Sequence, residues 1–194
     1  MTMTLCIFCG ALPGIRPAYR QAAERLGCLL AERQIAIVYG GGRVGLMGAL
    51  ADAALAAGGR VTGIIPRALF DRELGHNGVT ELRIVGSMHE RKAMMEELSD
   101  GFIALPGGFG TFEEIFEMIT WLQLGVHGKP CALLNIEGYF DALAGFVEHA
   151  SAEGFITSED RDLLLVDDDP ERLLDRVLAY RAPAATKWLA LEQT

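Results

Sequence analysis

The feature that most constrains this fold is a regular alternation of short apolar runs with longer segments of helical periodicity. Seven runs of mostly consecutive apolar residues occupy residues 4–10, 35–40, 60–66, 81–86, 101–107, 130–135 and 163–166. Strands without polar alternation are typical of a parallel sheet that is covered on both faces. Six helix candidates lie between or after these runs, at residues 17–33, 45–58, 88–100, 111–124, 139–152 and 170–180. The order predicts a doubly wound α/β sheet flanked by helices.

The length and the charge of the chain limit its organisation and its partners. The 194 residues show no linker, low-complexity segment or internal repeat, so we predict a single domain over residues 1–194. There are 17 basic and 26 acidic residues, and the net charge of −9 argues against a broad surface for nucleic acid or anionic membrane. No apolar run reaches membrane-spanning length, and the start, MTMTLCIFCG, lacks the basic n-region of an export signal. We therefore expect a cytoplasmic protein.

The cysteines and histidines are not spaced like metal ligands. Cys6 and Cys9 form a C-x-x-C pair, but no second Cys or His pair at ligand spacing accompanies it. Residues three apart in a strand point to opposite faces, so these thiols should diverge unless the strand has ended by Cys9. The four histidines show no H-E-x-x-H or comparable spacing. We predict reduced cytosolic thiols and no bound metal.

Glycines gather where the predicted strands end, in segments 9–14, 39–48 and 106–110. The polar segment 86–92 follows another strand in the same way. In open parallel α/β sheets, ligands bind in a crevice outside the carboxyl ends of the strands. The four segments can therefore converge on one crevice.

The first candidate for phosphate binding is Y-G-G-G-R-V-G at residues 39–45, a G-x-G-x-x-G pattern between a strand and a helix. A bare backbone at a helix start favours an anion, and Gly41, Gly42 and Gly45 are the predicted contacts. The alternative is that these glycines serve only a tight turn and close packing. Dinucleotide binding is disfavoured because no acid follows the next strand until Asp71. Neither this loop nor the next has the G-K-[ST] ending of a nucleoside-triphosphate loop.

The second candidate is P-G-G-F-G-T at residues 106–111. Gly107, Gly108 and Gly110 leave the backbone open to a ligand, and a monophosphate is expected to dock there. Thr111 is predicted to be the N-cap of the following helix, where its hydroxyl can also reach an anion.

Glu114 has two interpretations that the local pattern does not separate. Thr111-Phe-Glu-Glu114 fits a capping box, in which the glutamate reaches back to the N-cap amide. The other interpretation is a catalytic carboxylate beside a bound phosphosugar, because Glu113, Glu114 and Glu117 crowd one side of the predicted helix.

A second helix start carries cations. S-M-H-E at residues 87–90 fits a capping box, so Arg91 and Lys92 should fall in the first turns of the next helix. Exposed cations there oppose the helix dipole by about 0.3–1 kcal/mol each, so a phosphate or a neighbouring glutamate is expected, unless both are solvated. Arg91 is favoured as the site residue because it shares a helix face with Met88 and Met95.

Five methionines are predicted either to line an apolar ligand slot, with Met88 as a substrate contact, or to belong to the core: Met47, Met88, Met94, Met95 and Met118.

Four segments together resemble the LOG ("Lonely guy") family of cytokinin riboside 5′-monophosphate phosphoribohydrolases, whose members are often labelled lysine decarboxylases. They are P-G-G-F-G-T-F-E-E, which fits the signature P-G-G-x-G-T-x-x-E, then S-M-H-E-R-K-A-M-M, Y-G-G-G-R-V-G-L-M-G and T-W-L-Q-L-G-V-H-G-K-P. The resemblance covers nearly the whole chain. It implies a Rossmann-like homodimer without metal or redox cofactor. It also implies hydrolysis of the N-glycosidic bond of an N6-substituted adenosine 5′-monophosphate, which releases the free base and ribose 5-phosphate.

By position, the resemblance implies that Arg91 and Glu114 form the catalytic pair and that Glu73 lies by the base end of the pocket. The other nucleotide contacts that it implies are Lys92, Gly108, Phe109, Gly110, Thr111, Phe112, Glu113 and Thr120. The family usually has serines where this chain reads Ala11-Leu12, so any hydroxyl contact from that loop is absent.

Two other functions are open to test. The same loops would suit a module that binds a nucleotide or phosphorylated ligand without cleaving it. A lysine decarboxylase is set aside because no feature suggests a lysine site for pyridoxal phosphate.

Overall fold

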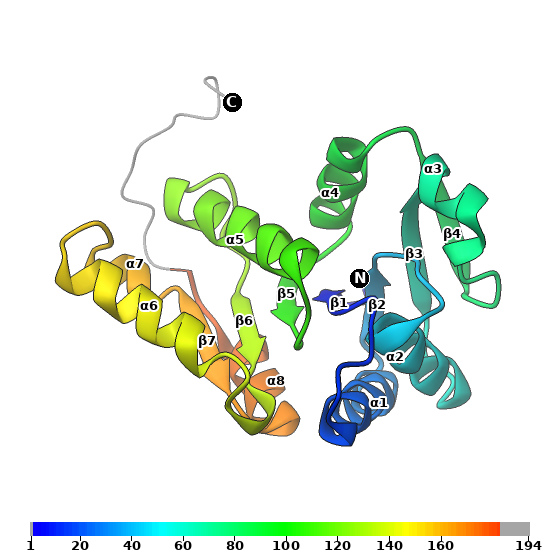
Figure 1. Cartoon of the computed structure of the whole chain (residues 1–194), viewed down its shortest axis with the longest axis horizontal. Helices are drawn as coiled ribbons and strands as arrows, with labels where there is room; N and C mark the ends of the chain where they lie inside the picture. The colour runs from blue at the N-terminus through cyan, green and yellow to red at the C-terminus, as the bar shows by residue number, and fades with distance from the viewer. Residues whose placement is uncertain (1, 183–194) are drawn as a thin grey trace.

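A seven-stranded parallel sheet forms the centre of the molecule (Figure 1). The computed structural model describes residues 2–182, without the side chain of Glu73. The strands are β1 Thr4–Phe8, β2 Ala36–Tyr39, β3 Val61–Pro66, β4 Glu81–Val85, β5 Gly101–Ala104, β6 Cys131–Leu134 and β7 Leu164–Asp167. Their order is β4-β3-β2-β1-β5-β6-β7, and every neighbouring pair is parallel. The predicted doubly wound sheet is confirmed, and all seven predicted strands are present.

Helices cover both faces of the sheet. They are α1 Pro17–Glu32, α2 Gly45–Ala56, α3 Arg67–Leu69, α4 Met88–Glu97, α5 Phe109–Leu124, α6 Asp141–Ala152, α7 Ser158–Arg161 and α8 Pro170–Ala179, with a π-helical turn η1 Phe70–Leu74 and a 3₁₀ turn η2 Ile136–Gly138. All six predicted helices are confirmed. The four unpredicted elements have three to five residues each, too few to show a helical period.

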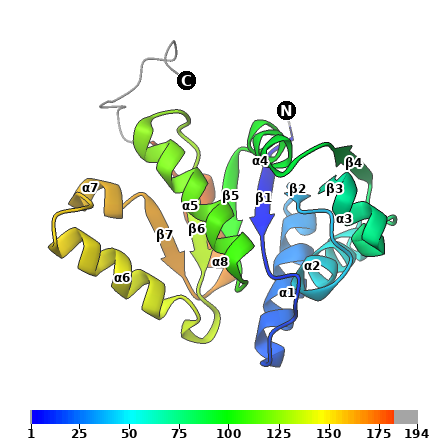
Figure 2. The ribbon, with the colours of Figure 1, turned by 45° about the horizontal axis from the view of Figure 1, so that its top comes forward.

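The strand residues divide between two apolar cores, one on each face of the sheet. Leu5 and Ile7 pack with α1, α2 and α8, whereas Cys6 and Phe8 pack with α4 and α5. Figure 2 shows the ribbon of these helices and of the sheet from a second direction. This alternation follows from the two-residue period of a strand. Cys9 packs in the first core and Cys6 in the second, so the two thiols diverge as expected. Burial raises the pKa of both thiols, which keeps them protonated and unreactive.

The strand order places a ligand crevice between β1 and β5. The chain winds outward from β1 to β4 in one direction and from β5 to β7 in the other. At this switch point, the loops after β1 and β5 separate toward opposite faces and leave a crevice at the carboxyl edge. Segments 9–14 and 105–108 follow these two strands.

Within residues 2–182, no helix combines the length and apolarity needed to span a bilayer.

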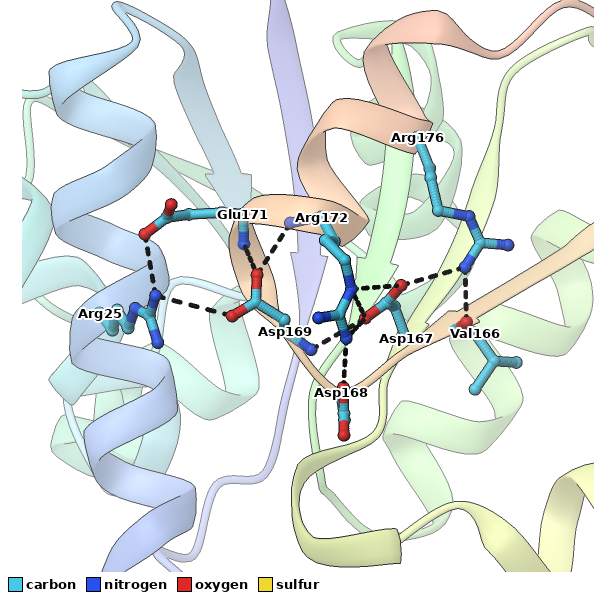
Figure 3. A network of polar contacts seen from close by, with 8 residues as sticks. All are labelled: Arg25, Val166, Asp167, Asp168, Asp169, Glu171, Arg172 and Arg176. Carbon is cyan, nitrogen blue, oxygen red and sulfur yellow. Dashed lines mark hydrogen bonds and ion pairs between the residues drawn. The ribbon is translucent and has the colours of Figure 1, made fainter.

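Acidic and basic side chains fasten α8 to the end of β7 (Figure 3). The Asp167 carboxylate accepts a hydrogen bond from Arg172 Nη2 at 2.7 Å and pairs with Arg176 Nη1 at 3.3 Å. Asp169 caps α8 by accepting from the amides of Glu171 and Arg172 at 3.0 and 2.9 Å. The hydrogen bonds from Arg172 lower the pKa of Asp167 to about 2.

We expect Asp167→Asn to lower the free energy of unfolding at pH 7 by about 1–2 kcal/mol, because charged hydrogen bonds are lost in a partly exposed network. The folded-state pKa lies below the ordinary value of 3.8, so the carboxylate stabilises the fold above about pH 4. That contribution is lost as the pH falls toward 2. Urea unfolding at pH 7 and near pH 2 measures it. Asp168→Asn is the matched control with a small expected effect, because that side chain is 73% exposed and its ion pair with Arg172 is solvated. An equal deficit for Asp167→Asn at both pH values would contradict the assignment.

Candidate active site

A cavity of about 530 Å³ lies at the switch point, at the carboxyl edge of the sheet. Its walls come from the loop after β1, the start of α2, the first turns of α4, the turn after β5 with the start of α5, and Tyr139. All four segments that were predicted to converge therefore contribute to the cavity, and segment 39–48 does so only through Leu46 and Met47 at the start of α2. A larger groove lies at the opposite edge of the sheet, between the ends of α1 and α2, away from the glycine turns.

Helix α5 begins earlier than predicted, and its start has no side-chain cap. Gly108 is the N-cap, and its carbonyl accepts from the amide of Phe112 at 3.1 Å. Thr111 is therefore the third residue of the helix, and the prediction that it caps the helix was wrong. Its hydroxyl instead lies against Gly107, where an added Cβ would be 2.1 Å from Thr111 Oγ1. The glycines allow the chain to enter the helical conformation before Thr111.

The first turn of α5 presents unused hydrogen-bond donors. Among residues 2–182, the backbone amides of Gly108, Phe109, Gly110 and Thr111 donate no hydrogen bond. A Cβ added at Gly108 or Gly110 would meet no atom within 4 Å, so packing does not require glycine at either position. Free amides and the helix dipole favour an anion at such a start.

Arg91 of α4 and Glu114 of α5 form a buried ion pair beside this helix start. The two residues are 8% and 6% exposed, and Arg91 Nη2 lies 3.0 Å from Glu114 Oε1. Gly40 leaves room for the guanidinium, because a Cβ there would be 2.3 Å from Arg91 Nη2. Arg91 Nη1 also donates to Met88 Sδ at 3.7 Å, whereas the buried Arg91 Nε has no hydrogen-bond partner in the described part of the chain.

Glu114 forms an ion pair with Arg91 of α4 instead of capping its own helix. The capping-box interpretation was wrong, because the N-cap is Gly108 and the carboxylate is turned toward Arg91. Burial raises the pKa of Glu114 above the ordinary range, and the neighbouring Arg91 partly opposes that shift. A carboxyl group whose pKa is raised in a cavity is suited to proton transfer or charge stabilisation.

Lys92 is also buried, and two glutamates of α5 neutralise it. Its ammonium group pairs with Glu113 and, at 3.1 Å, with Glu117. The alternative that Arg91 and Lys92 are both solvated was therefore wrong. Ser87 Oγ accepts from the amide of Glu90 at 3.1 Å, so the predicted N-cap of α4 is confirmed.

The other predicted contacts divide into two groups. Those that line the cavity are Met88, Gly107, Gly108, Gly110, Thr111 and Glu113. Those outside its lining are Lys92, Phe109, Phe112 and Thr120. Thr120 lies nine residues beyond Thr111, about 13 Å along α5, and donates to the carbonyl of Phe116. Glu73 belongs to η1, but its side chain lies outside the described part of the structure.

The glycines of the first loop lie outside the cavity lining and have packing roles. Gly41 and Gly45 have positive φ angles of 73° and 64°. A Cβ at Gly45 would be 2.3 Å from the backbone of Ala11, and the amide of Leu46 donates to the carbonyl of Gly10 at 3.0 Å. These contacts favour the packing alternative. Phosphate binding by Gly41, Gly42 and Gly45 stays a prediction that the cavity does not support.

The sequence did not predict the two tyrosines that line the cavity, Tyr19 and Tyr139. Tyr139 lines the cavity, and its hydroxyl donates to the carbonyl of Gly107. The segment 139–152 was predicted only as a helix, and nothing local connects Tyr139 with a turn more than 30 residues earlier. Among the described residues, no group of three or more His, Cys, Asp or Glu side chains is arranged to hold a metal ion.

Comparison with known proteins identifies the family. A family model described as "Possible lysine decarboxylase" matches residues 47–177. A cytokinin riboside 5′-monophosphate phosphoribohydrolase of Rhodococcoides fascians is 50% identical over 181 residues, which cover 93% of this chain and 90% of the relative. The chain belongs to the LOG family. Another LOG family protein, from Arabidopsis thaliana, has the same activity in its name and is 45% identical over 176 residues, covering 91% of this chain and 83% of the relative.

The LOG family fold extends to more distant proteins. The molybdenum cofactor binding protein of Rippkaea orientalis superposes with a TM-score of 0.71 at 21% identity, covering 92% of this chain and 97% of that chain. At that identity the likeness shows a shared fold only. The Rossmann-like architecture implied by the sequence is thereby confirmed.

Proposed function

We propose that this LOG family protein hydrolyses the N-glycosidic bond of N6-substituted adenosine 5′-monophosphates, which releases the free base and ribose 5-phosphate. The observation that carries the proposal is the buried Arg91–Glu114 pair beside an uncapped helix start in one cavity. The names of relatives at 45–50% identity support the same reaction.

The start of α5 is the proposed binding site for the 5′-phosphate. Four amides at the N-cap and in the first turn donate no hydrogen bond within residues 2–182, and the open space around Gly108 and Gly110 allows phosphate oxygens to approach the backbone. Glu114 follows Thr111 by three residues, which is about one helical turn. A ribose held by its phosphate at the helix start would therefore lie beside this carboxyl group.

The reaction exchanges the bond to the base for a bond to water. The bond between C1′ of the ribose and N9 of the base breaks, and its electron pair stays with N9. The oxygen of a water molecule bonds to C1′, one proton of that water remains on the new hydroxyl, and the other ends on the base. Cleavage of a glycosidic bond passes through an oxocarbenium-like state, which a nearby carboxylate stabilises. In this proposal Glu114 faces that cationic sugar or the water, and Arg91 holds Glu114 in place.

The remaining walls of the cavity suit a flat base with an apolar substituent. Leu12, Leu46, Met47, Leu69 and Met88 contribute to the lining. Apolar walls with a few polar groups at one end are typical of small-molecule sites, and methionines adapt to irregular shapes.

A panel of adenine compounds, scored for released base, tests the proposed function. We expect release from isopentenyl-AMP and AMP, and at least about 100-fold slower release from the riboside without phosphate, because the anchoring charge is missing. Equal cleavage of ribosides and their 5′-phosphates would overturn the assignment of the helix start. Thermal stabilisation by these nucleotides without any released base would favour a binding module. Release of CO₂ from lysine would reopen the decarboxylase hypothesis.

The proposal includes a cytoplasmic homodimer. Leu12, Ile15 and Phe109 are large apolar side chains that stand exposed, and each belongs to or adjoins in sequence a segment that lines the cavity. Exposed apolar side chains that gather on one surface mark interaction sites. All four cysteines are free, which suits a reducing compartment. We expect light scattering to give twice the chain mass of 21.0 kDa. A monomeric mass at micromolar concentration would contradict the dimer.

A further inference from the structure

We infer that Tyr139 is a positioning residue that sets the orientation of the phosphate-binding turn before α5. This inference rests on the proposed function, because it concerns the turn to which the phosphate is assigned. It starts from the hydrogen bond between the Tyr139 hydroxyl and the carbonyl of Gly107.

The turn between β5 and α5 is held from outside. The amide of Gly10 donates to the carbonyl of Pro106 at 3.1 Å, and the Tyr139 hydroxyl donates to the next carbonyl, that of Gly107. Two successive carbonyls are thus fixed by other parts of the chain. The Gly107 contact is the one made by a side chain, so it can be removed without changing the backbone.

Fixing the carbonyl of Gly107 also fixes a donor of the proposed phosphate site. The carbonyl of Gly107 and the amide of Gly108 belong to one peptide group, which is planar and trans, so the two point in opposite directions. Glycine imposes little restriction on the rotation of that peptide group. Without the Tyr139 bond, the amide of Gly108 would sample several orientations instead of one.

The segment that delivers Tyr139 is unusually constrained. Glu137 and Gly138 both have left-handed backbones, with φ angles of 50° and 71°. For glutamate this conformation costs about 1 kcal/mol, and such strain is retained where surrounding contacts impose it. Glu137 pairs with Arg16 at 2.9 Å. The side chain of Asn135 closes the turn by bonding Asp141 and the amide of Phe140, each at 2.7 Å.

A second aromatic ring holds the side chain of Tyr139. The ring of Tyr19, from α1, packs edge-on against it with centroids 5.6 Å apart. The position of the Tyr139 hydroxyl is therefore fixed both by the backbone turn before it and by the packing of its ring. Both constraints place the hydroxyl at the carbonyl of Gly107, whereas a tyrosine that only filled space would not need its hydroxyl there.

Tyr139→Phe tests the inference, with ribose 5-phosphate as the probe. In calorimetric titration, Tyr139→Phe should bind ribose 5-phosphate about tenfold more weakly than the unchanged protein does, because one hydrogen bond is lost. The KM for isopentenyl-AMP should rise about tenfold while kcat changes less than about threefold, because uniform binding is lost. The melting temperature without ligand shows whether the variant folds. Tyr139→Met, which also lacks the hydroxyl, repeats the test if Tyr139→Phe does not fold.

Tyr180→Phe is the matched control. Among residues 2–182 the buried hydroxyl of Tyr180 has no hydrogen-bond partner, and it lies outside the cavity, so its removal should leave ribose 5-phosphate binding unchanged. If Tyr139→Phe and Tyr180→Phe bind the probe equally while the unchanged protein releases base, the positioning role is overturned and the proposed function stands. If the unchanged protein neither binds ribose 5-phosphate nor releases base, both proposals fail together.

Discussion

Replacing Glu114 by glutamine should lower kcat/KM for isopentenyl-AMP by about 1,000-fold, which corresponds to about 4 kcal/mol of transition-state stabilisation. The amide keeps the size of the side chain and can still accept a hydrogen bond from Arg91, but it carries no charge toward the oxocarbenium-like state. Base release measured by chromatography, with substrate varied, gives kcat and KM separately. We expect the loss in kcat rather than in KM, because the carboxylate acts on charge that develops during the reaction.

The same substitution should also cost stability, which the local sequence pattern did not suggest. Glu114→Gln leaves the buried guanidinium of Arg91 without the carboxylate that lies 3.0 Å away. Removing one partner of a buried ion pair strongly destabilises a protein. Arg91 also lines the cavity, where water can reach it, so we expect the free energy of unfolding to fall by about 1–3 kcal/mol.

Glu96→Gln separates lost stability from lost catalysis. Glu96 pairs with Lys129 outside the cavity, and both side chains are partly buried. This control should lose stability on a similar scale and keep its turnover. If Glu114→Gln turned over substrate as fast as Glu96→Gln, the catalytic assignment of Glu114 would be untenable. Chemical unfolding and base release are measured on the same preparations.

The fold was predictable because its signals are local. Most strands are runs of mainly apolar residues, and the long helices between them are separated by glycines or polar turns. Element ends were less accurate: α4 ends at Glu97 and α6 begins at Asp141, whereas the predicted ranges were 88–100 and 139–152. Helix ends depend on which backbone amides find acceptors, and that depends on tertiary contacts.

The two capping-box patterns show where sequence reasoning about the site stops. Ser87 caps α4 as predicted, and Glu90 reaches back to the amide of Gly86 at 2.7 Å. Thr111 and Glu114 have the same spacing but form no capping box. Glycines before Thr111 let α5 start earlier, and Arg91 on a different helix takes the carboxylate. The local pattern is the same in both cases, and only the neighbouring helix distinguishes them.

Long-range contacts account for the rest of what the sequence did not show. Tyr139 contacts Gly107, which lies 32 positions earlier in the chain. The turn before Tyr139 contains Glu137 in a left-handed conformation, which the sequence does not predict for a glutamate. A side chain at position 40 would collide with Arg91, which explains the glycine there, and no local motif predicts this contact. The motif containing Gly40 was assigned to phosphate binding because loops with that function look the same in sequence.

Replacing Gly110 by alanine should damage activity while leaving the fold as stable or slightly more stable. Gly110 is the second residue of α5, and an added Cβ would meet no protein atom within 4 Å. Alanine favours a helix over glycine by about 0.5–1 kcal/mol, so the melting temperature should stay level or rise by about 1–4 °C. The methyl group would enter the cavity where the phosphate is assigned, so we expect kcat/KM for isopentenyl-AMP to fall at least about tenfold.

Gly145→Ala is the matched substitution at a neutral place. Gly145 lies within α6, outside the cavity lining, and its added Cβ would also meet nothing within 4 Å. Both variants should therefore melt at similar temperatures, and only Gly110→Ala should lose turnover and affinity for ribose 5-phosphate. A Gly110→Ala protein with unchanged KM would mean that no ligand approaches the backbone there, and the free amides of α5 would then need water as their partner. Because both glycines are helical and an added Cβ meets no protein atom at either, a loss of turnover confined to Gly110→Ala points to the ligand.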